Sequence, residues 1–184
     1  MRIISGEYRG RILKNPSDNK TRPTSDRLRE TLFNILSPKI SSDARFLDLC
    51  AGTGAVGIEA ISRGAEFSTF VDKSRRACAL IEENLDLLKI SEQQTEVVCD
   101  SAERFVSRKH TKFWDIVFFD PPYKIDYGVF LYEFGANAEN LLSENGILIV
   151  EHHVKNVLSD SVIDVRRRRV VKQGETNLSF YERK

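Results

Sequence analysis

An acidic residue, two prolines and an aromatic residue form the motif with the clearest chemical meaning in this sequence. Asp120, Pro121, Pro122 and Tyr123 directly follow the apolar run 116–119. Proline has no backbone N–H, so the carbonyls of this stiff segment and the Asp120 carboxylate are held as hydrogen-bond acceptors. Such acceptors can bind both protons of a planar nucleobase amine and leave its lone pair facing an electrophilic methyl group. We predict that these four residues are catalytic through positioning and electrostatics, with Tyr123 stacking on the base.

A glycine-rich segment follows a second apolar run, 46–49. Gly52, Gly54 and Gly57 match the pattern GxGxxG, and a helix is expected from there to about residue 62. Glycine lets the backbone turn sharply and approach a ligand closely. Asp72 lies 20 residues beyond Gly52, where a carboxylate on the next strand can accept protons from ribose hydroxyls. Dinucleotide-binding and S-adenosylmethionine-binding folds share this geometry, so the pattern by itself does not decide between these two classes of cofactor.

Aspartates mark the ends of four expected strands. Asp48, Asp72, Asp100 and Asp120 lie at or next to the ends of apolar runs. Ligands of an open parallel sheet bind beyond the carboxyl ends of its strands, so we expect these four side chains to converge on one cleft. Asp100 could accept the amino proton of an adenine, could cap a helix over 102–106, or could do both.

The order of the expected elements predicts the fold class. The chain has 184 residues, which fits a single domain. Short apolar runs alternate with helix-period segments, as in an α/β fold with a largely parallel sheet. We expect one or two short strands over 2–13, a polar loop over 14–24, and a helix that starts at 24–26 and ends before Pro38. Further strands are expected at 46–49, 69–71, 96–99, 116–119 and 147–150, the last after a turn at 144–146.

The composition argues against several classes of protein. Hydrophobic residues make up 41% and charged residues 30%, and no apolar run approaches the roughly 18 residues of a membrane span. Charged side chains interrupt the first ten residues, so we expect no export signal and a cytoplasmic protein with no membrane partner. Cys50, Cys78 and Cys99 form no CxxC or Cys/His cluster, so we expect buried small hydrophobic residues and neither a disulfide framework nor a zinc site.

Four segments together resemble the RsmD family of S-adenosylmethionine-dependent 16S rRNA (guanine-N2)-methyltransferases. They read RIISGEYRGRIL (2–13), RPTSDRLRETLFNIL (22–36), DLCAGTGAVG (48–57) and GETNLSFY (174–181). The resemblance implies a Rossmann-like class I methyltransferase fold with a mostly parallel seven-stranded sheet whose last strand is antiparallel. Val162–Val171 and Leu178–Tyr181 would form the final hairpin. A single domain, 1–184, would consist of a basic N-terminal extension, 1–24, and a catalytic core, 25–184.

The same resemblance implies roles for individual residues. Asp48, Gly52 and Gly54 would hold the methionine part of S-adenosylmethionine, Asp72 the ribose, and Asp100 the adenine. The full set of implied cofactor-binding residues is Asp48, Cys50, Ala51, Gly52, Thr53, Gly54, Asp72, Lys73, Asp100, Ser101 and Ala102. Asp120 and the Pro121 carbonyl would accept the guanine amine protons, with no metal required.

The first 30 residues are basic, with eight basic and four acidic side chains. The substrate that the resemblance implies is 16S rRNA, which we expect within a small-subunit ribosomal particle. The side chains expected to contact its phosphates are Arg2, Arg9, Arg11, Arg22, Arg27 and Arg29. A second basic run, Arg166–Arg169, either contacts RNA or protects an edge strand, and regular alternation would place at most two of its four side chains on one face.

Several other functions use parts of the same pattern. A dehydrogenase would explain the glycine loop and Asp72 but leave Asp100 and Asp120 without a role. DNA adenine-N6 and protein glutamine-amide methyltransferases act on planar amines with the same chemistry, so the catalytic motif does not separate them from an rRNA enzyme. A noncatalytic RNA-binding assembly factor on the same fold is a further alternative, against which the intact Asp120–Tyr123 motif argues.

Overall fold

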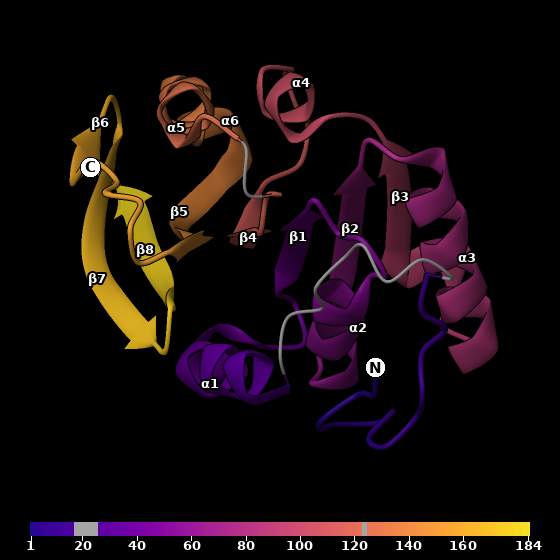
Figure 1. The fold of residues 1–184 in the computed structure, drawn as a ribbon. Helices are drawn as coiled ribbons and strands as arrows, with labels where there is room; N and C mark the ends of the chain where they lie inside the picture. The colour runs from indigo at the N-terminus through magenta and orange to yellow at the C-terminus, as the bar shows by residue number, and fades with distance from the viewer. Residues whose placement is uncertain (17–25, 123–124) are drawn as a thin grey trace.

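The computed structural model describes residues 1–16, 26–122 and 125–184. Within these residues one sheet has eight strands in the order β3-β2-β1-β4-β5-β8-β7-β6 (Figure 1). The strands are β1 (Arg45–Leu49), β2 (Phe67–Asp72), β3 (Thr95–Cys99), β4 (Trp114–Phe119), β5 (Leu142–His153), β6 (Ser161–Val162), β7 (Val165–Gln173) and β8 (Thr176–Arg183). The first five strands pair in parallel, and β8 pairs antiparallel with both β5 and β7.

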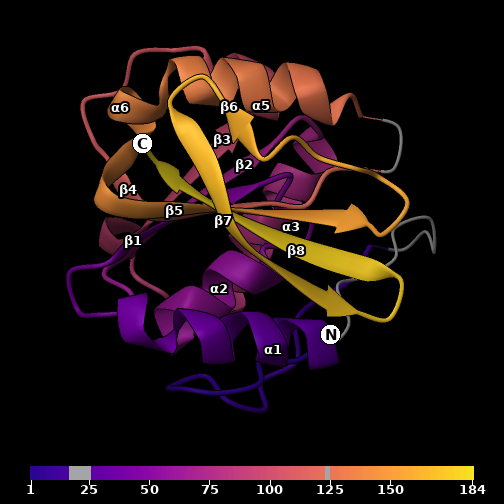
Figure 2. The same ribbon diagram turned by 90° about the vertical axis from the view of Figure 1, so that its left-hand side faces the viewer.

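Helices cover both faces of this sheet, giving the three layers seen in Figure 2. The helices are α1 (Asp26–Leu36), α2 (Ala55–Ser62), α3 (Arg75–Leu88), α4 (Ala102–Val106), α5 (Tyr127–Ala136) and α6 (Ala138–Leu141), with short 3-10 turns η1 (Ser37–Lys39) and η2 (Glu92–Gln94). Apolar side chains of α1, α2 and α3 pack on one face, and those of α4, α5 and α6 pack on the other. Each side of the sheet therefore has its own core.

The expected α/β fold and the antiparallel last strand are confirmed. The prediction of seven strands is wrong by one, because the two-residue strand β6 pairs with the start of β7. The fifth strand is also longer than expected and includes the predicted turn at 144–146. The β4–β5 pairing steps from Trp114↔Leu142 to Ile116↔Ile147, so residues 143–146 bulge out of the ladder rather than end it.

The N-terminal segment lies over the outer side of α2 and closes that layer (Figure 1). Its backbone N–H groups at Ile4 and Ser5 donate to the two carboxylate oxygens of Glu59 at 2.8 and 3.0 Å. The residues of α2 are consequently all buried, Glu59 included. The strands expected over 2–13 reduce to one antiparallel bridge, Arg2↔Ile12, because side chains of the core take up backbone donors that a sheet would use.

No helix in the described parts of the chain is long and apolar enough to cross a membrane. The prediction that the three cysteines are buried holds for Cys78 alone, since Cys50 is half-buried and Cys99 is exposed at the end of β3.

Candidate active site

The backbone brings the ends of the four central strands to one edge of the sheet. The N–H of Ala51 donates to the carbonyl of Val71 at 3.0 Å, and the N–H of Asp100 donates to the carbonyl of Asp72 at 3.1 Å. On the other side of β1, the N–H of Asp120 reaches the carbonyl of Leu49 at 3.4 Å. Asp48, Asp72, Asp100 and Asp120 therefore lie along a single edge, as the parallel order of the strands predicts.

The glycine loop joins β1 to α2 and is fastened by Asp72. Gly52 and Gly54 adopt positive φ angles of 57° and 77°, which are accessible to glycine without a steric penalty. The Gly52 N–H donates to one oxygen of the Asp72 carboxylate at 3.0 Å, and the Ser74 N–H donates to the other at 2.8 Å. Each carboxylate oxygen can accept a second hydrogen bond, so Asp72 both orders the loop and retains capacity for a ligand hydroxyl.

Gly57 has a packing role rather than a place at the open edge. A Cβ atom on this residue would lie 2.3 Å from a ring carbon of Phe70 on β2, so only glycine lets α2 approach the sheet this closely. Its N–H donates to Asp48 at 2.9 Å. The third glycine of the motif thus sets the distance between helix and strand.

Asp48 is buried beneath the loop. Its exposed fraction is 2%. Burial raises the pKa of Asp48 to about 8; the Gly57 hydrogen bond opposes this shift, and the nearby charges of Asp120 and Asp72 add to it. The three carboxylates are close enough to influence one another, so a cationic ligand group at this edge would be favoured.

Cys50 stands at the first turn of the loop with a φ angle of 64°, an uncommon conformation for a residue other than glycine. Burial raises the pKa of its thiol, and the charges of Asp72 and Asp120 raise it further. The thiol is therefore protonated at neutral pH and is not a nucleophile. Lys73, which follows β2, is exposed.

The capping role that the sequence left open for Asp100 belongs to Ser101. The Ser101 hydroxyl accepts from the N–H of Arg104 and begins α4, while its own N–H donates to Asp100 at 2.9 Å. The Asp100 carboxylate instead pairs with Arg104 at 3.5 Å and with Arg108 at 2.5 Å. Ala102, the first residue of α4, is buried. Two guanidinium groups therefore face the Asp100 carboxylate at this nearly buried position.

Asn84 on α3 is a site residue that the sequence reasoning missed. Its amide donates to the carbonyl of Thr53, between the two turn glycines, at 3.0 Å. The side chain is completely buried. Asn84 lies beside the apolar positions Ile81, Leu85 and Leu88 of the same helix, and a polar residue on a buried stripe is the signal that could have identified it.

The predicted catalytic motif lies between β4 and α5. Pro121 is buried and Pro122 is exposed, and the Pro122 carbonyl accepts from the N–H of Ile125 at 3.2 Å. Asp126 then caps α5 by accepting from the N–H groups of residues 128 and 129. The motif is consequently anchored at both ends, by the sheet and by a capped helix. Tyr123 lies outside the described residues.

The predicted RNA-contacting arginines have different environments. The prediction that Arg29 contacts RNA phosphates is wrong, because its side chain is completely buried. Its guanidinium donates to the Arg2 carbonyl at 2.7 Å and to Asp26 at 2.8 Å. It ties the N-terminal segment to α1. Arg2 is exposed beside Asp26, and Arg11 is exposed beside the end of α3. Arg9 and Arg27 are exposed, and Arg22 lies outside the described residues.

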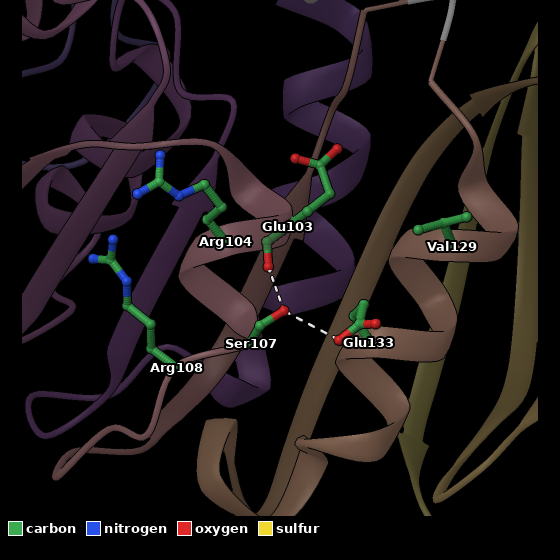
Figure 3. Close-up of a pocket in the computed structure, with 6 residues that line it drawn as sticks. All are labelled: Glu103, Arg104, Ser107, Arg108, Val129 and Glu133. Carbon is green, nitrogen blue, oxygen red and sulfur yellow. Dashed lines mark hydrogen bonds between the residues drawn. The ribbon is translucent and has the colours of Figure 1, made fainter.

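A pocket lies between α4 and α5 (Figure 3). It is lined by Glu103, Arg104, Ser107, Arg108, Val129 and Glu133. Across it, the Ser107 hydroxyl is 3.1 Å from a carboxylate oxygen of Glu133. None of the lining residues is among the predicted cofactor-binding set. Among the described residues, no group of three or more His, Cys, Asp or Glu side chains is arranged to hold a metal ion.

The sheet order, the glycine loop and the aspartates at one edge define the Rossmann-like fold of class I methyltransferases.

The model of the family described as Conserved hypothetical protein 95 matches residues 1–182. Ribosomal RNA small subunit methyltransferase D of Escherichia coli is 37% identical, with all of this chain and 90% of the relative aligned. The enzyme of that name from Haemophilus influenzae is 38% identical over 80% of this chain and 73% of its own length. The solved structure of yhhF from Escherichia coli superposes with a TM-score of 0.85 at 34% identity, covering 100% of this chain and 97% of that one. The chain therefore belongs to this family, the RsmD family that its motifs predicted.

Proposed function

We propose that this protein transfers a methyl group from S-adenosylmethionine to the exocyclic N2 amine of a guanine in 16S ribosomal RNA. The observation that carries the proposal is the position of Asp120. Its backbone is bonded to the end of β1, directly before the glycine loop, so a base amine at Asp120 and a cofactor on the loop would be neighbours. The family relatives named as small-subunit rRNA methyltransferases support the choice of RNA.

The residues present fit the proposed cofactor. The loop leaves the half-buried backbone of Gly52 without a side chain, Gly54 is buried behind it, and Asp72 has acceptor capacity for ribose hydroxyls. Asp72 and Asp120 supply negative charge where the cationic methionine part would lie, whereas Asp48, with its pKa raised to about 8, is largely protonated at neutral pH and fastens the loop through Gly57. Bound there, the cofactor supplies an electrophilic methyl group.

The chain's own contribution is to orient the amine. A guanine amine is a poor nucleophile because its lone pair is delocalised into the ring. Asp120 and the Pro121 carbonyl would accept its two protons, favour a more tetrahedral nitrogen and stabilise the positive charge that develops there. Tyr123 would stack on the base after it leaves its own stack. No side chain needs to form a covalent bond.

The test is transfer of labelled methyl from S-adenosylmethionine to small ribosomal subunits from a strain that lacks this gene, followed by nucleoside analysis. Label in N2-methylguanosine is the expected result. Label in DNA adenine or in a protein amide would assign one of the other planar amines. Binding of RNA without any label would identify a noncatalytic assembly factor. Comparing protein-free RNA with the subunit tests our further proposal that a ribosomal particle presents the base.

A further inference from the structure

Positive charge is concentrated at the two ends of the chain. Residues 1–30 carry four more basic than acidic side chains, and residues 161–184, with seven basic and three acidic side chains, do the same. Since the whole chain has a net charge of +1, the segment 31–160 has a net charge of −7. The proposed function uses the N-terminal excess but leaves the C-terminal one unexplained.

The arginine run of β7 does not alternate as a regular strand would. Arg167 pairs with Tyr181, and the next pair along the ladder joins Arg169 to Phe180. Arg168 is thus an extra residue in β7, which defines a β-bulge. Beyond such a bulge, every side chain changes face relative to the regular pattern.

The bulge gathers arginines on the face that α1 covers. Phe180 packs in the core cluster of α1, whereas Tyr181 packs in the cluster of α4, α5 and α6. Residues directly opposite in an antiparallel pair lie on the same face. Arg169, opposite Phe180, is therefore on the α1 face, and so is Arg166, which pairs with Glu182, two residues along β8 from Phe180.

Arg168 joins the same face. Its Nε lies 3.2 Å from a carboxylate oxygen of Glu182. Arg167 is on the other face and pairs with Asp160. Three of the four arginines thus share one face, where regular alternation had allowed two.

The charge on this face is poorly compensated. Glu182 pairs with Arg168, but within the described parts of the chain Arg166 and Arg169 form no ion pair, and both are exposed. Protection of an edge strand does not require this arrangement, because the bulge already interrupts the edge and charges on either face would serve. An uncompensated pair of arginines is instead suited to a polyanion.

Arg169 is the member of the pair that lies nearer the proposed active site. Phe119, Val150, Ser179 and Val170 are consecutive partners in one row across β4, β5, β8 and β7. Asp120 follows the first residue of this row, and Arg169 precedes the last. Three strand spacings of roughly 4.8 Å and about two residues of offset along the strands put Asp120 and Arg169 about 16 Å apart. Arg166 lies in the row of Ile116, four residues before Asp120, and is roughly 20 Å away. An RNA strand with its target base at Asp120 would cover these distances within a few nucleotides.

We infer that Arg166 and Arg169, together with Arg168, form a phosphate-binding surface for the RNA that flanks the target guanine. This inference rests on the proposed function, because RNA is the polyanion that function brings to this edge. The surface positions RNA and contributes nothing to the chemistry at Asp120, so its loss should raise KM for RNA and leave kcat unchanged.

The experiment compares two double variants that remove equal charge. Arg166→Ala/Arg169→Ala removes the uncompensated pair, and Lys89→Asn/Lys109→Ala is the control. Lys89 and Lys109 are exposed after α3 and α4, and asparagine tolerates the left-handed backbone of residue 89. Affinity for a labelled 16S rRNA fragment is measured as a function of salt. Losing two phosphate contacts should lower the salt slope by about 1.5 and weaken binding roughly tenfold or more near 0.1 M salt, while the control stays close to wild type.

The outcomes separate the inference from the proposed function. If the wild-type protein labels N2-methylguanosine but the arginine variant binds RNA like the control, the inference is overturned and the proposed function stands. If the wild-type protein neither labels nor binds small-subunit RNA, the proposed function fails first. A variant that retains RNA affinity but forms larger species on size exclusion would show edge protection instead. Loss of affinity for intact subunits alone would assign the surface to a ribosomal protein, which also overturns the inference.

Discussion

The side-chain amide of Asn84 donates to the carbonyl of Thr53 at 3.0 Å and, on its other side, pairs with the backbone of Lys14. The Lys14 N–H donates to Asn84 Oδ1 at 2.8 Å, and Asn84 Nδ2 donates back to the Lys14 carbonyl at 3.2 Å. One buried side chain therefore holds both the glycine loop and the basic N-terminal segment. A shift of either segment must be transmitted to the other through this amide.

Asn84→Ala should loosen both segments at once. It leaves three backbone groups without their partner, so we expect the free energy of unfolding to fall by about 1–3 kcal/mol and the Kd for S-adenosylmethionine to rise. Chemical denaturation and calorimetric titration measure the two effects. Glu83→Ala, the adjacent control, removes only an exposed ion pair with Lys14 and should cost less than about 1 kcal/mol. Equal effects of the two substitutions would contradict the role of Asn84.

Asp120→Ala should separate catalysis from cofactor binding. Removing one oriented acceptor from the transition state is expected to lower kcat by roughly two to three powers of ten, with little change in the Kd for S-adenosylmethionine. Single-turnover methyl transfer and calorimetry give the two values. Near-normal turnover would remove Asp120 from the catalytic role.

Tyr123 is predicted to act through its ring rather than its hydroxyl. Tyr123→Ala should destabilise the transition state of methyl transfer by about 1–3 kcal/mol, because a base–aromatic stacking contact is lost. Tyr123→Phe keeps the ring and should be close to wild type in kcat/KM. A large effect of the phenylalanine variant would indicate that the hydroxyl takes part.

Asp48 should make stability fall as pH rises. Its pKa is about 8 in the folded protein against an ordinary value of 3.8, so the folded state holds a proton that the unfolded state releases. The stabilising contribution is complete below about pH 4 and is lost as pH rises through 8, with a slope of at most about 1.4 kcal/mol per pH unit. Asp48→Asn keeps an acceptor for Gly57 and removes this titration. Urea unfolding at pH 5 and pH 8 should show the variant gaining relative to wild type at the higher pH, and a constant difference would disprove the shift.

Arg29→Ala should affect stability but not RNA binding, and Arg27→Ala should do the reverse. Arg29 is buried between the N-terminal segment and α1, so its loss should lower the free energy of unfolding by about 1–3 kcal/mol and leave the salt slope of RNA binding unchanged. Arg27 is exposed on the same helix, and its loss should lower the salt slope by just under 1 with little effect on stability. Thermal unfolding together with salt-dependent binding distinguishes them.

Local patterns in the sequence were sufficient for the fold class and for the convergence of four aspartates on one edge of the sheet. Apolar runs followed by aspartates at 48, 72, 100 and 120 reflect strands buried on both faces, and parallel strands necessarily bring their carboxyl ends to one edge. The glycine spacing likewise predicts the turn after β1, because positive φ angles at Gly52 and Gly54 are a local requirement.

Contacts between distant segments depended on tertiary structure. Neighbours in sequence cannot reveal that Arg29 is buried under the N-terminal segment, that Ser101 rather than Asp100 caps α4, or that Asn84 holds Thr53 from 31 residues away. The β7 arginines also differ from the regular alternation expected from the sequence, because the bulge at Arg168 is set by the pairing register with β8. Residue type and spacing determine which groups can do the chemistry, whereas burial and register, which arise only when segments pack together, determine which of them reach the substrate.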